Sequence, residues 1–354
     1  MKNKLLLSSA LLGSLVIGSF AQAQTTITGG LIIAGKSQSD MATQAQSARS
    51  MGRESQINIQ NKGKLNNGMD YAAGFALEFD GGQTQDASNE NVYIDIISGD
   101  TTLTFGVDHI QNTNRTRGVL VGNDAQDLHN GSGLGASAFI QAAGSDPAQS
   151  MGAGIVQKTP VGSFSALYVP TAANAGVNDL VTASGGASQA SGQQIQGTGE
   201  SAYEIGFVGD LGVKALSAHA FFNKRGHLGV DKAVGLAGDT KGLNIGASYQ
   251  FGATTVGYNR KETKDNTALA SGRETEQDEF GLAYQVSPNL SVGLNHTKVD
   301  SNAAAAVDAK STSIALGYNL GPVAATVQYA KGEDITNTTN TDMDVLYLKL
   351  STAF

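Results

Sequence analysis

The chain has 354 residues, with 45 glycines, 5 prolines, no cysteine and no tryptophan, and a formal net charge of −8 at pH 7. The absence of cysteine excludes a fold held by disulfides, and the acidic balance argues against a nucleic-acid partner. The scarcity of proline suits long paired strands, because proline cannot donate a hydrogen bond to a β-ladder.

The N-terminal segment has the pattern of a secretory signal. Lys2 and Lys4 are followed by an uncharged, mostly apolar stretch from residue 5 to 20 and by small residues at Ala21 and Ala23. This pattern predicts that residues 1–23 are cleaved, leaving 24–354 as the mature domain; an uncleaved N-terminal anchor is the alternative. Removing the two lysines changes the net charge from −8 to −10. No later apolar run approaches the roughly 18 residues of a membrane helix.

From residue 25 onward the sequence alternates between apolar and polar residues in segments of about ten, the length that a tilted membrane strand needs. Short turns alternate with longer polar connections, as in an up-and-down barrel. The predicted strands span residues 25–36, 54–64, 70–80, 91–97, 101–108, 151–159, 163–170, 202–209, 213–224, 242–251, 254–261, 279–286, 290–298, 311–320, 323–330 and 344–354. We therefore expect an all-β, transmembrane, antiparallel barrel of about sixteen strands.

The alternation assigns a face to each side chain. In the segment 279–286, Phe280, Leu282 and Tyr284 share one face, and Glu279 and Gln285 share the other. The apolar face is expected to contact lipid and the polar face to line the lumen. A barrel of about sixteen strands leaves an aqueous channel, whereas about eight strands fill the interior with side chains. The pattern predicts a water-filled pore.

The last predicted strand repeats this pattern up to the final residue. Leu346, Leu348, Leu350 and Phe354 share one face, while Tyr347 lies on the other. An exposed aromatic residue at the end of a strand is typical of the aromatic girdle of an outer-membrane barrel. Phe354 is therefore predicted to point outward.

Three segments resemble a known family. The run Asn91-Val-Tyr-Ile-Asp-Ile-Ile-Ser-Gly-Asp-Thr-Thr-Leu-Thr-Phe-Gly-Val-Asp108 resembles the hairpin that precedes the constriction loop of trimeric general-diffusion porins of Gram-negative bacteria. Residues 55–61 and 75–78 resemble the second and third strands of those porins. The resemblance implies a sixteen-stranded homotrimer in contact with outer-membrane lipid. It also implies a third external loop, about 109–150, folded into the pore, and Phe354 as an assembly signal.

Charged residues of this loop and of the facing wall are the candidate constriction site, because opposed charges across a narrow aqueous gap select ions. The loop side comprises Asp108, Arg115, Arg117, Asp124 and Asp127, and the wall side comprises Arg53, Gln56, Gln60, Lys62 and Glu78. Relatives often carry basic residues at the positions of Gln56, Gln60 and Asp108. The thinned basic wall predicts a weak preference for cations. Ordinary solvated loop charges are the alternative interpretation.

The expected function is passive diffusion of small hydrophilic solutes and ions, with no cofactor, metal or catalytic activity. The main alternative is a substrate-specific channel for small anions or sugars. A barrel enzyme and a soluble secreted β protein or adhesin are further alternatives. Residues 30–37 match a P-loop pattern, but they lie in a predicted strand without the following helix that a P-loop needs. No G-x-S-x-G or H-E-x-x-H motif is present.

Overall fold

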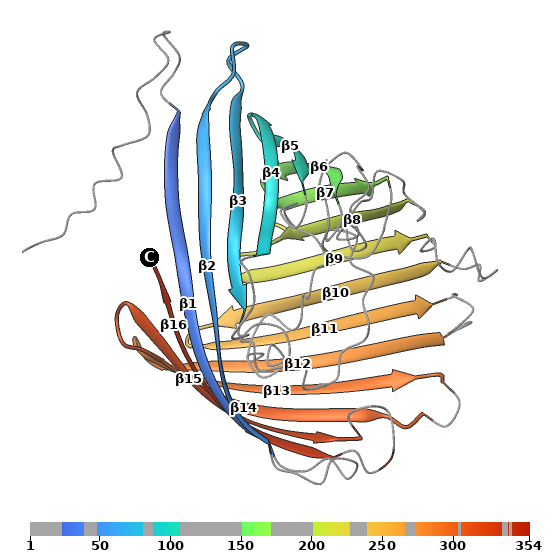
Figure 1. The fold of residues 1–354 in the computed structure, drawn as a ribbon. Helices are drawn as coiled ribbons and strands as arrows, with labels where there is room; N and C mark the ends of the chain where they lie inside the picture. Colours follow the sequence, from blue (N-terminus) through green and yellow to red (C-terminus); the bar gives the residue numbers. More distant parts are fainter. Residues whose placement is uncertain are drawn as a thin grey trace, which may run out of the picture.

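The computed structural model describes residues 23–38, 48–80, 88–106, 151–170, 201–226, 239–265, 273–303, 306–334, 339 and 342–354. The described residues form sixteen antiparallel strands that close into one barrel, in which sequence neighbours pair and β1 pairs with β16 (Figure 1). The described residues contain no helix that is long and apolar enough to cross a membrane. Residues 1–22 of the predicted signal and the predicted constriction loop 109–150 lie outside the described residues.

All sixteen predicted strands are confirmed. They are β1 (Gln24–Gln38), β2 (Ala48–Lys64), β3 (Asp70–Asp80), β4 (Ser88–Ser98), β5 (Thr101–Gly106), β6 (Gly152–Thr159), β7 (Gly162–Val169), β8 (Ala202–Gly209), β9 (Leu216–Arg225), β10 (Thr240–Phe251), β11 (Thr254–Asp265), β12 (Arg273–Ser287), β13 (Leu290–Ser301), β14 (Ala309–Asn319), β15 (Val323–Glu333) and β16 (Met343–Ala353). Short turns close one end of the barrel, and the longer connections join strands at the other end.

Several strands are longer than the alternation predicts. β12 begins at Arg273, six residues before the predicted start, and β2 begins at Ala48 instead of residue 54. These extensions carry polar and charged residues on both faces, so they lack the apolar alternation that marks a membrane strand. Backbone pairing continues through them: Lys264 pairs with Glu274 in the β11–β12 ladder, and their side chains lie 3.6 Å apart.

β9 begins later than predicted, at Leu216 instead of residue 213. The chain turns sharply before it, with positive φ angles at Leu211 and Ala215. The backbone N–H of Gly212 donates to the Asp210 carboxylate over 2.9 Å, which stabilises this turn. Residue 213 therefore belongs to the turn, because its backbone N–H bonds back to the Asp210 carbonyl.

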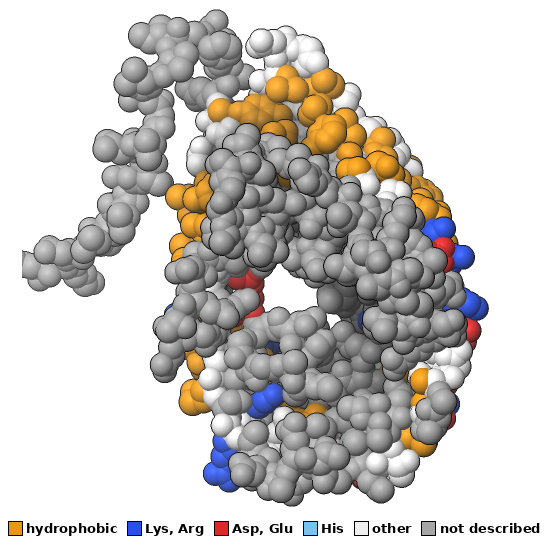
Figure 2. All heavy atoms as spheres, turned by 45° about the vertical axis from the view of Figure 1, so that its right-hand side comes forward, with side chains coloured by type: hydrophobic (Ala, Val, Ile, Leu, Met, Phe, Trp, Pro, Cys, Tyr) orange, Lys and Arg blue, Asp and Glu red, His pale blue; other side chains and the backbone are white. Residues whose placement is uncertain are grey.

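The two faces of the barrel differ as the alternation predicts. Large apolar side chains such as Ile245, Phe280 and Leu348 are exposed on the outer surface, and Figure 2 shows hydrophobic side chains spread over the outside of the barrel. Their strand neighbours on the inner face are polar in most sectors, as with Asn244 and Glu279. Figure 2 also shows an opening through the molecule with acidic side chains at its edge.

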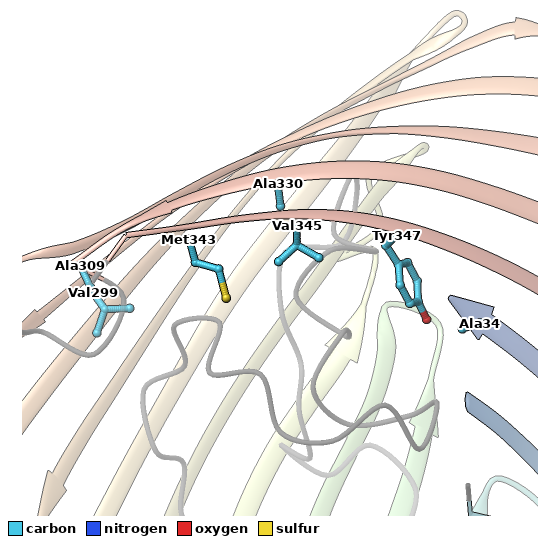
Figure 3. Packing of buried hydrophobic residues seen from close by; sticks show 7 residues of the cluster. All are labelled: Ala34, Val299, Ala309, Ala330, Met343, Val345 and Tyr347. Carbon is cyan, nitrogen blue, oxygen red and sulfur yellow. The ribbon is translucent and has the colours of Figure 1, made fainter. Parts of the chain in front are cut away.

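One inner sector is apolar, which corrects the expectation of a polar lumenal face all round. A buried cluster lies on the inward faces of β13–β16 and β1, toward the end with the long connections (Figure 3). Its members are Ala34, Val299, Ala309, Ala330, Met343, Val345 and Tyr347. Their register places them opposite one another on adjacent strands, as in the pairs Ala330–Val345 and Val299–Ala309. Strand alternation alone does not distinguish this sector from a lipid-facing one.

Phe354 lies at the seam where the barrel closes. Its backbone N–H donates to the carbonyl of Gly29 over 2.9 Å, and the N–H of Gly29 donates to the carbonyl of Phe354 over 2.7 Å. The Phe354 side chain is exposed, as predicted. Its ring lies over Gly29, so that a Cβ added there would be 2.6 Å from the ring and 2.7 Å from the Gln56 carbonyl oxygen. Gly29 therefore leaves the space that the closing contact needs.

We predict that Gly29→Ala weakens closure of the barrel by about 1–3 kcal/mol, the usual cost of overpacking a well-filled site. Gly30→Ala is the matched control, because its Cβ would have its nearest contact at 3.6 Å. The stability of both variants is measured by urea unfolding in lipid vesicles. The folded fraction at each urea concentration is read from the heat-dependent electrophoretic mobility of the barrel. Equal midpoints for the two variants would contradict the assigned role of the seam.

Candidate functional site: the inner wall of the barrel

The wall formed by β2 and β3 contains four of the predicted site residues. The register pairs Gln56 with Glu78, and Gln60 and Lys62 follow on the same face of β2. This face is the inward one, because Ile57 and Ile59 alternate with them and pair with outward-facing partners such as Ile27. The structure therefore places Gln56, Gln60, Lys62 and Glu78 together on the lumenal side.

The prediction that Arg53 faces the lumen is wrong. Arg53 pairs with Ile33 in the β1–β2 ladder and shares the outer surface with Met51. Both of those apolar side chains are exposed. The reason is that β2 begins at Ala48, so the alternation already applies at residue 53 and turns its side chain outward. The predicted loop-side residues Asp108, Arg115, Arg117, Asp124 and Asp127 lie outside the described residues.

A tyrosine on β4 lies flat along the wall beside the predicted residues. The Gln60 side-chain amide donates a hydrogen bond to the Tyr93 hydroxyl oxygen. Gly74 of β3 lies between these two residues in the register, and a Cβ there would be 3.0 Å from the tyrosine ring. The absence of a side chain at Gly74 thus lets Tyr93 lie against the wall.

A larger polar network that the sequence did not reveal crosses β9 to β12, and a further buried pair joins β8 to β9. His219 Nε2 lies 2.9 Å from Asn259 Oδ1 and 3.2 Å from Asn244 Oδ1. With both amides oriented in this way, Nε2 carries the proton and donates to the two oxygens. On β8 and β9, Asn223 Nδ2 donates to the Glu204 carboxylate over 3.2 Å. All five side chains are buried.

The network ends on the carboxylate of Glu279, which is fully buried. Asn259 Nδ2 donates to Glu279 Oε2 over 3.0 Å, and the Gln277 amide donates to Glu279 Oε1. Lys261 Nζ lies 3.9 Å from Glu279 Oε1. A buried carboxylate needs such donors, because an unpaired charge away from water is strongly unfavourable. These contacts hold the side chains in one arrangement along the wall.

Glycine makes room for the network on the intervening strand. Gly246 of β10 lies between His219 and Asn259 in the register. A Cβ at Gly246 would be 2.5 Å from Asn259 Oδ1 and 2.6 Å from His219 Cε1. The histidine therefore reaches across β10 along the wall instead of projecting into the pore. Alternation places each of these residues on the inner face, but only the register brings them together.

Charges on the inner wall are balanced among the strand side chains that the structure describes. The inward carboxylates are Glu54, Asp70, Glu78, Asp95, Glu204 and Glu279, and the inward ammonium groups are Lys36, Lys62, Lys64, Lys158, Lys261 and Lys349. They are unevenly distributed: Glu54 and Glu78 lie toward the long connections on β2 and β3, whereas Lys62, Lys64, Asp70 and Asp95 lie near the short turns, with Asp95 in the same row as Lys62. The negative net charge of the chain therefore does not give the charge of the inner wall, where the described side chains are balanced.

Comparison with known proteins agrees with this architecture. The sequence model described as Gram-negative porin matches residues 8–340. The anion-selective porin from Comamonas acidovorans has a similar structure, with a TM-score of 0.65, 14% identity, and coverage of 94% of this chain and 100% of that chain. A mutant of the Rhodopseudomonas blastica porin has a TM-score of 0.61 and 15% identity, with coverage of 94% of this chain and 100% of that chain. A loop-deletion mutant of OmpT, an outer-membrane protein of Vibrio cholerae, has a TM-score of 0.61 and 13% identity, with coverage of 94% of this chain and 99% of that chain. No curated protein sequence matches the chain.

We predict that Gly246→Ala displaces His219 from Asn259 and lowers the stability of the barrel by about 1–3 kcal/mol. The displaced imidazole should also project into the lumen and lower single-channel conductance. Gly30→Ala again serves as the control, since Gly30 also faces inward and has space for a methyl group. An unchanged urea midpoint together with unchanged conductance would show that the wall tolerates the methyl group.

Proposed function

The chain belongs to the Gram-negative porin family, and we propose that its barrel is a general-diffusion channel for small hydrophilic solutes and ions. The protein is an outer-membrane β-barrel, so the short turns face the periplasm and the long connections face outward. The observation that supports the proposal is the inner wall, where buried Asn, Gln, Ser and Thr side chains lie on the lumenal face of many of the described strands. Such a surface holds water and offers many weak contacts instead of one selective site.

The proposal includes a weak preference for cations. Its support is the inner wall of β2 and β3, where Glu54 and Glu78 share the lumenal face with the neutral Gln56 and Gln60. The balance of charges over the rest of the described wall keeps the expected preference small. Asp108 belongs to the same proposal as an acidic residue at the end of the predicted fifth strand.

The proposed narrowest point is the loop of residues 109–150, folded into the pore so that Arg115, Arg117, Asp124 and Asp127 face the wall. Its length and its mixed charge support this assignment, because loops beyond about 15 residues in compact domains are usually functional or disordered. The acidic and basic side chains would set a transverse field across the pore.

Assembly is part of the same proposal. We expect residues 1–23 to be removed on export and the barrels to associate as homotrimers; one related structure, OmpT of Vibrio cholerae, is described as a trimer form. We assign Phe354 as an assembly signal, supported by its reciprocal backbone hydrogen bonds with Gly29 at the closing seam. A catalytic role is not part of the proposal.

The second candidate function is a substrate-specific channel for small anions. One similar structure is described as an anion-selective porin, and Lys261 and Lys349 lie on the inner wall of this barrel. Lys261 lies close to the Glu279 carboxylate, so its charge is partly offset. Lys36, Lys62, Lys64 and Lys349 do lie on the neighbouring strands β16, β1 and β2. Glu54 lies on the same inner face of β2, and Lys64 is paired with Asp70 at 2.6 Å, so the lysines do not form an uninterrupted anion track. We therefore favour the general channel.

We predict that the native channel prefers cations at about 0.1 M salt, where the Debye length is about 10 Å. Glu78→Gln should lower the cation-to-anion permeability ratio by about twofold, since a unit charge about 10 Å from an ion in water contributes roughly 0.4 kcal/mol. Asp108→Arg should move the ratio further toward anions. Reversal potentials in a salt gradient measure the ratio.

The control for this measurement is Glu262→Gln, because Glu262 carries the same charge on the outer surface of β11 beside Arg260. It should leave the reversal potential unchanged. Anion preference in the native channel at low salt would refute the selectivity proposal, while leaving the channel function intact.

We predict that deleting residues 134–145 raises single-channel conductance, because a shorter loop leaves a wider aqueous path. Deletion of residues 180–191 removes the same length from the other long connection and should leave conductance close to native. If the first deletion has no effect, the loop lies outside the channel and the proposed constriction is wrong.

A further inference from the structure

A recess in the inner wall of the barrel lies where the short turn between β14 and β15 meets β16, β1 and β2. The register aligns inward-facing side chains of these five strands in one row, namely Asn319, Ala324, Ser351, Ile32 and Glu54. The neighbouring row contains Ala353, Gly30 and Gln56. The recess therefore belongs to the lumen and lies on the opposite side of the wall from the lipid.

Small residues form the floor of the recess. Its volume is about 480 Å³, and the floor consists of Gly30, Ala324, Ser351 and Ala353 on three adjacent strands. Ala324 and Ala353 are exposed, so the recess is open to water. A volume of this size falls in the range of roughly 300–1,000 Å³ that is usual for small-molecule sites. The recess can therefore hold a solute of the size of a monosaccharide.

The side chains that border the recess carry one carboxylate and several neutral hydrogen-bonding groups. Glu54 supplies the carboxylate, Gln56 and Asn319 supply two amides, and Ser351 supplies a hydroxyl. The Asn319 side-chain oxygen accepts a hydrogen bond from the backbone N–H of Gly321 over 2.8 Å, which holds this side chain beside the turn. Amides and hydroxyls both donate and accept, so they match the hydroxyl groups of a solute.

The charges around the recess favour a cationic solute. Glu78 pairs with Gln56 in the β2–β3 ladder, so a second inward carboxylate lies on the next strand. Among the inward lysines of the described strands, Lys349 is the closest to the recess in the register, but it is not one of the lining residues. A carboxylate beside a recess with low-dielectric walls raises the local concentration of cations.

We propose that the recess binds a small polyhydroxylated solute that carries one ammonium group, as an amino sugar does. The ammonium group donates a charge-assisted hydrogen bond to the Glu54 carboxylate, and the hydroxyl groups pair with Gln56, Asn319 and Ser351. The floor of small residues lets the solute lie against the wall. This inference rests on the proposed diffusion function and names one class of solute that the channel retains during passage.

The test uses the purified full-length mature protein in detergent micelles and glucosamine as the probe, at a mildly acidic pH where its amine is protonated. Isothermal titration calorimetry measures the affinity and does not require conduction. Glucose, which has a hydroxyl in place of the ammonium group, and ammonium chloride, which has no ring, are the comparisons. Glucosamine should bind about tenfold more tightly than either, because only glucosamine makes both kinds of contact.

Three variants separate the parts of the site. Glu54→Gln should weaken glucosamine binding about tenfold, as expected for loss of a charge-assisted hydrogen bond. Glu78→Gln is the matched control, because it removes the same charge from the inner wall but outside the recess; it should weaken binding about twofold at most. Ala324→Leu fills the recess and should weaken binding although both carboxylates remain. Conductance in potassium chloride, recorded for each variant, shows that the barrel is folded.

Equal glucosamine affinity of the native protein and Glu54→Gln would overturn the proposal. Equal losses in Glu54→Gln and Glu78→Gln would also overturn it, because cations would then accumulate along the whole acidic wall without a site. Equally tight binding of glucose would reject the ammonium contact. A native channel that conducts but does not bind glucosamine refutes the recess alone, whereas a protein that does not conduct refutes the proposed diffusion function.

Discussion

Closure of the backbone hydrogen-bond ladder between β1 and β16 is the constraint on which the rest of the structure depends. In hydrocarbon, each unpaired backbone N–H or C=O group costs several kcal/mol, so an open sheet edge cannot face lipid. Nine register pairs join β1 to β16, and the contact between Gly29 and Phe354 continues the pairing at one end. Once the ladder closes, the residues that point inward on each strand are fixed by the residues that point inward on the two strands beside it.

The inner wall stays open because its large side chains lie along it. His219 and Tyr93 cross over Gly246 and Gly74 on neighbouring strands, where any other residue would place a Cβ in their path. The same arrangement supplies partners for buried polar groups, since Asn259 contacts both His219 and Glu279. Glycine therefore serves the channel in two ways, by keeping the lumen wide and by letting hydrogen bonds span three strands.

Charge is distributed by face, and the net charge of the chain conceals this. Among the inward strand side chains that the structure describes, carboxylates and ammonium groups balance, and the outward cations Arg260, Lys298 and Lys331 are paired with carboxylates on the outer surface. The solutes and the lipids thus meet different electrostatic surfaces on one sheet. Arg49 and Arg53 depart from this pattern, because the described side chains on the outer face of β1–β3 include no carboxylate.

The sequence alone determined the number of strands and the side of the barrel on which Gln56, Gln60, Lys62 and Glu78 lie. That information is local, because side chains alternate with a period of two wherever the chain is extended. The face of Arg53 was missed because the first six residues of β2 lack the apolar alternation from which the strands were predicted. The contact of His219 with Asn259 and the apolar cluster around Val345 were decided only by the tertiary structure, since both depend on the register between strands, which pairing and closure set and which no single strand contains.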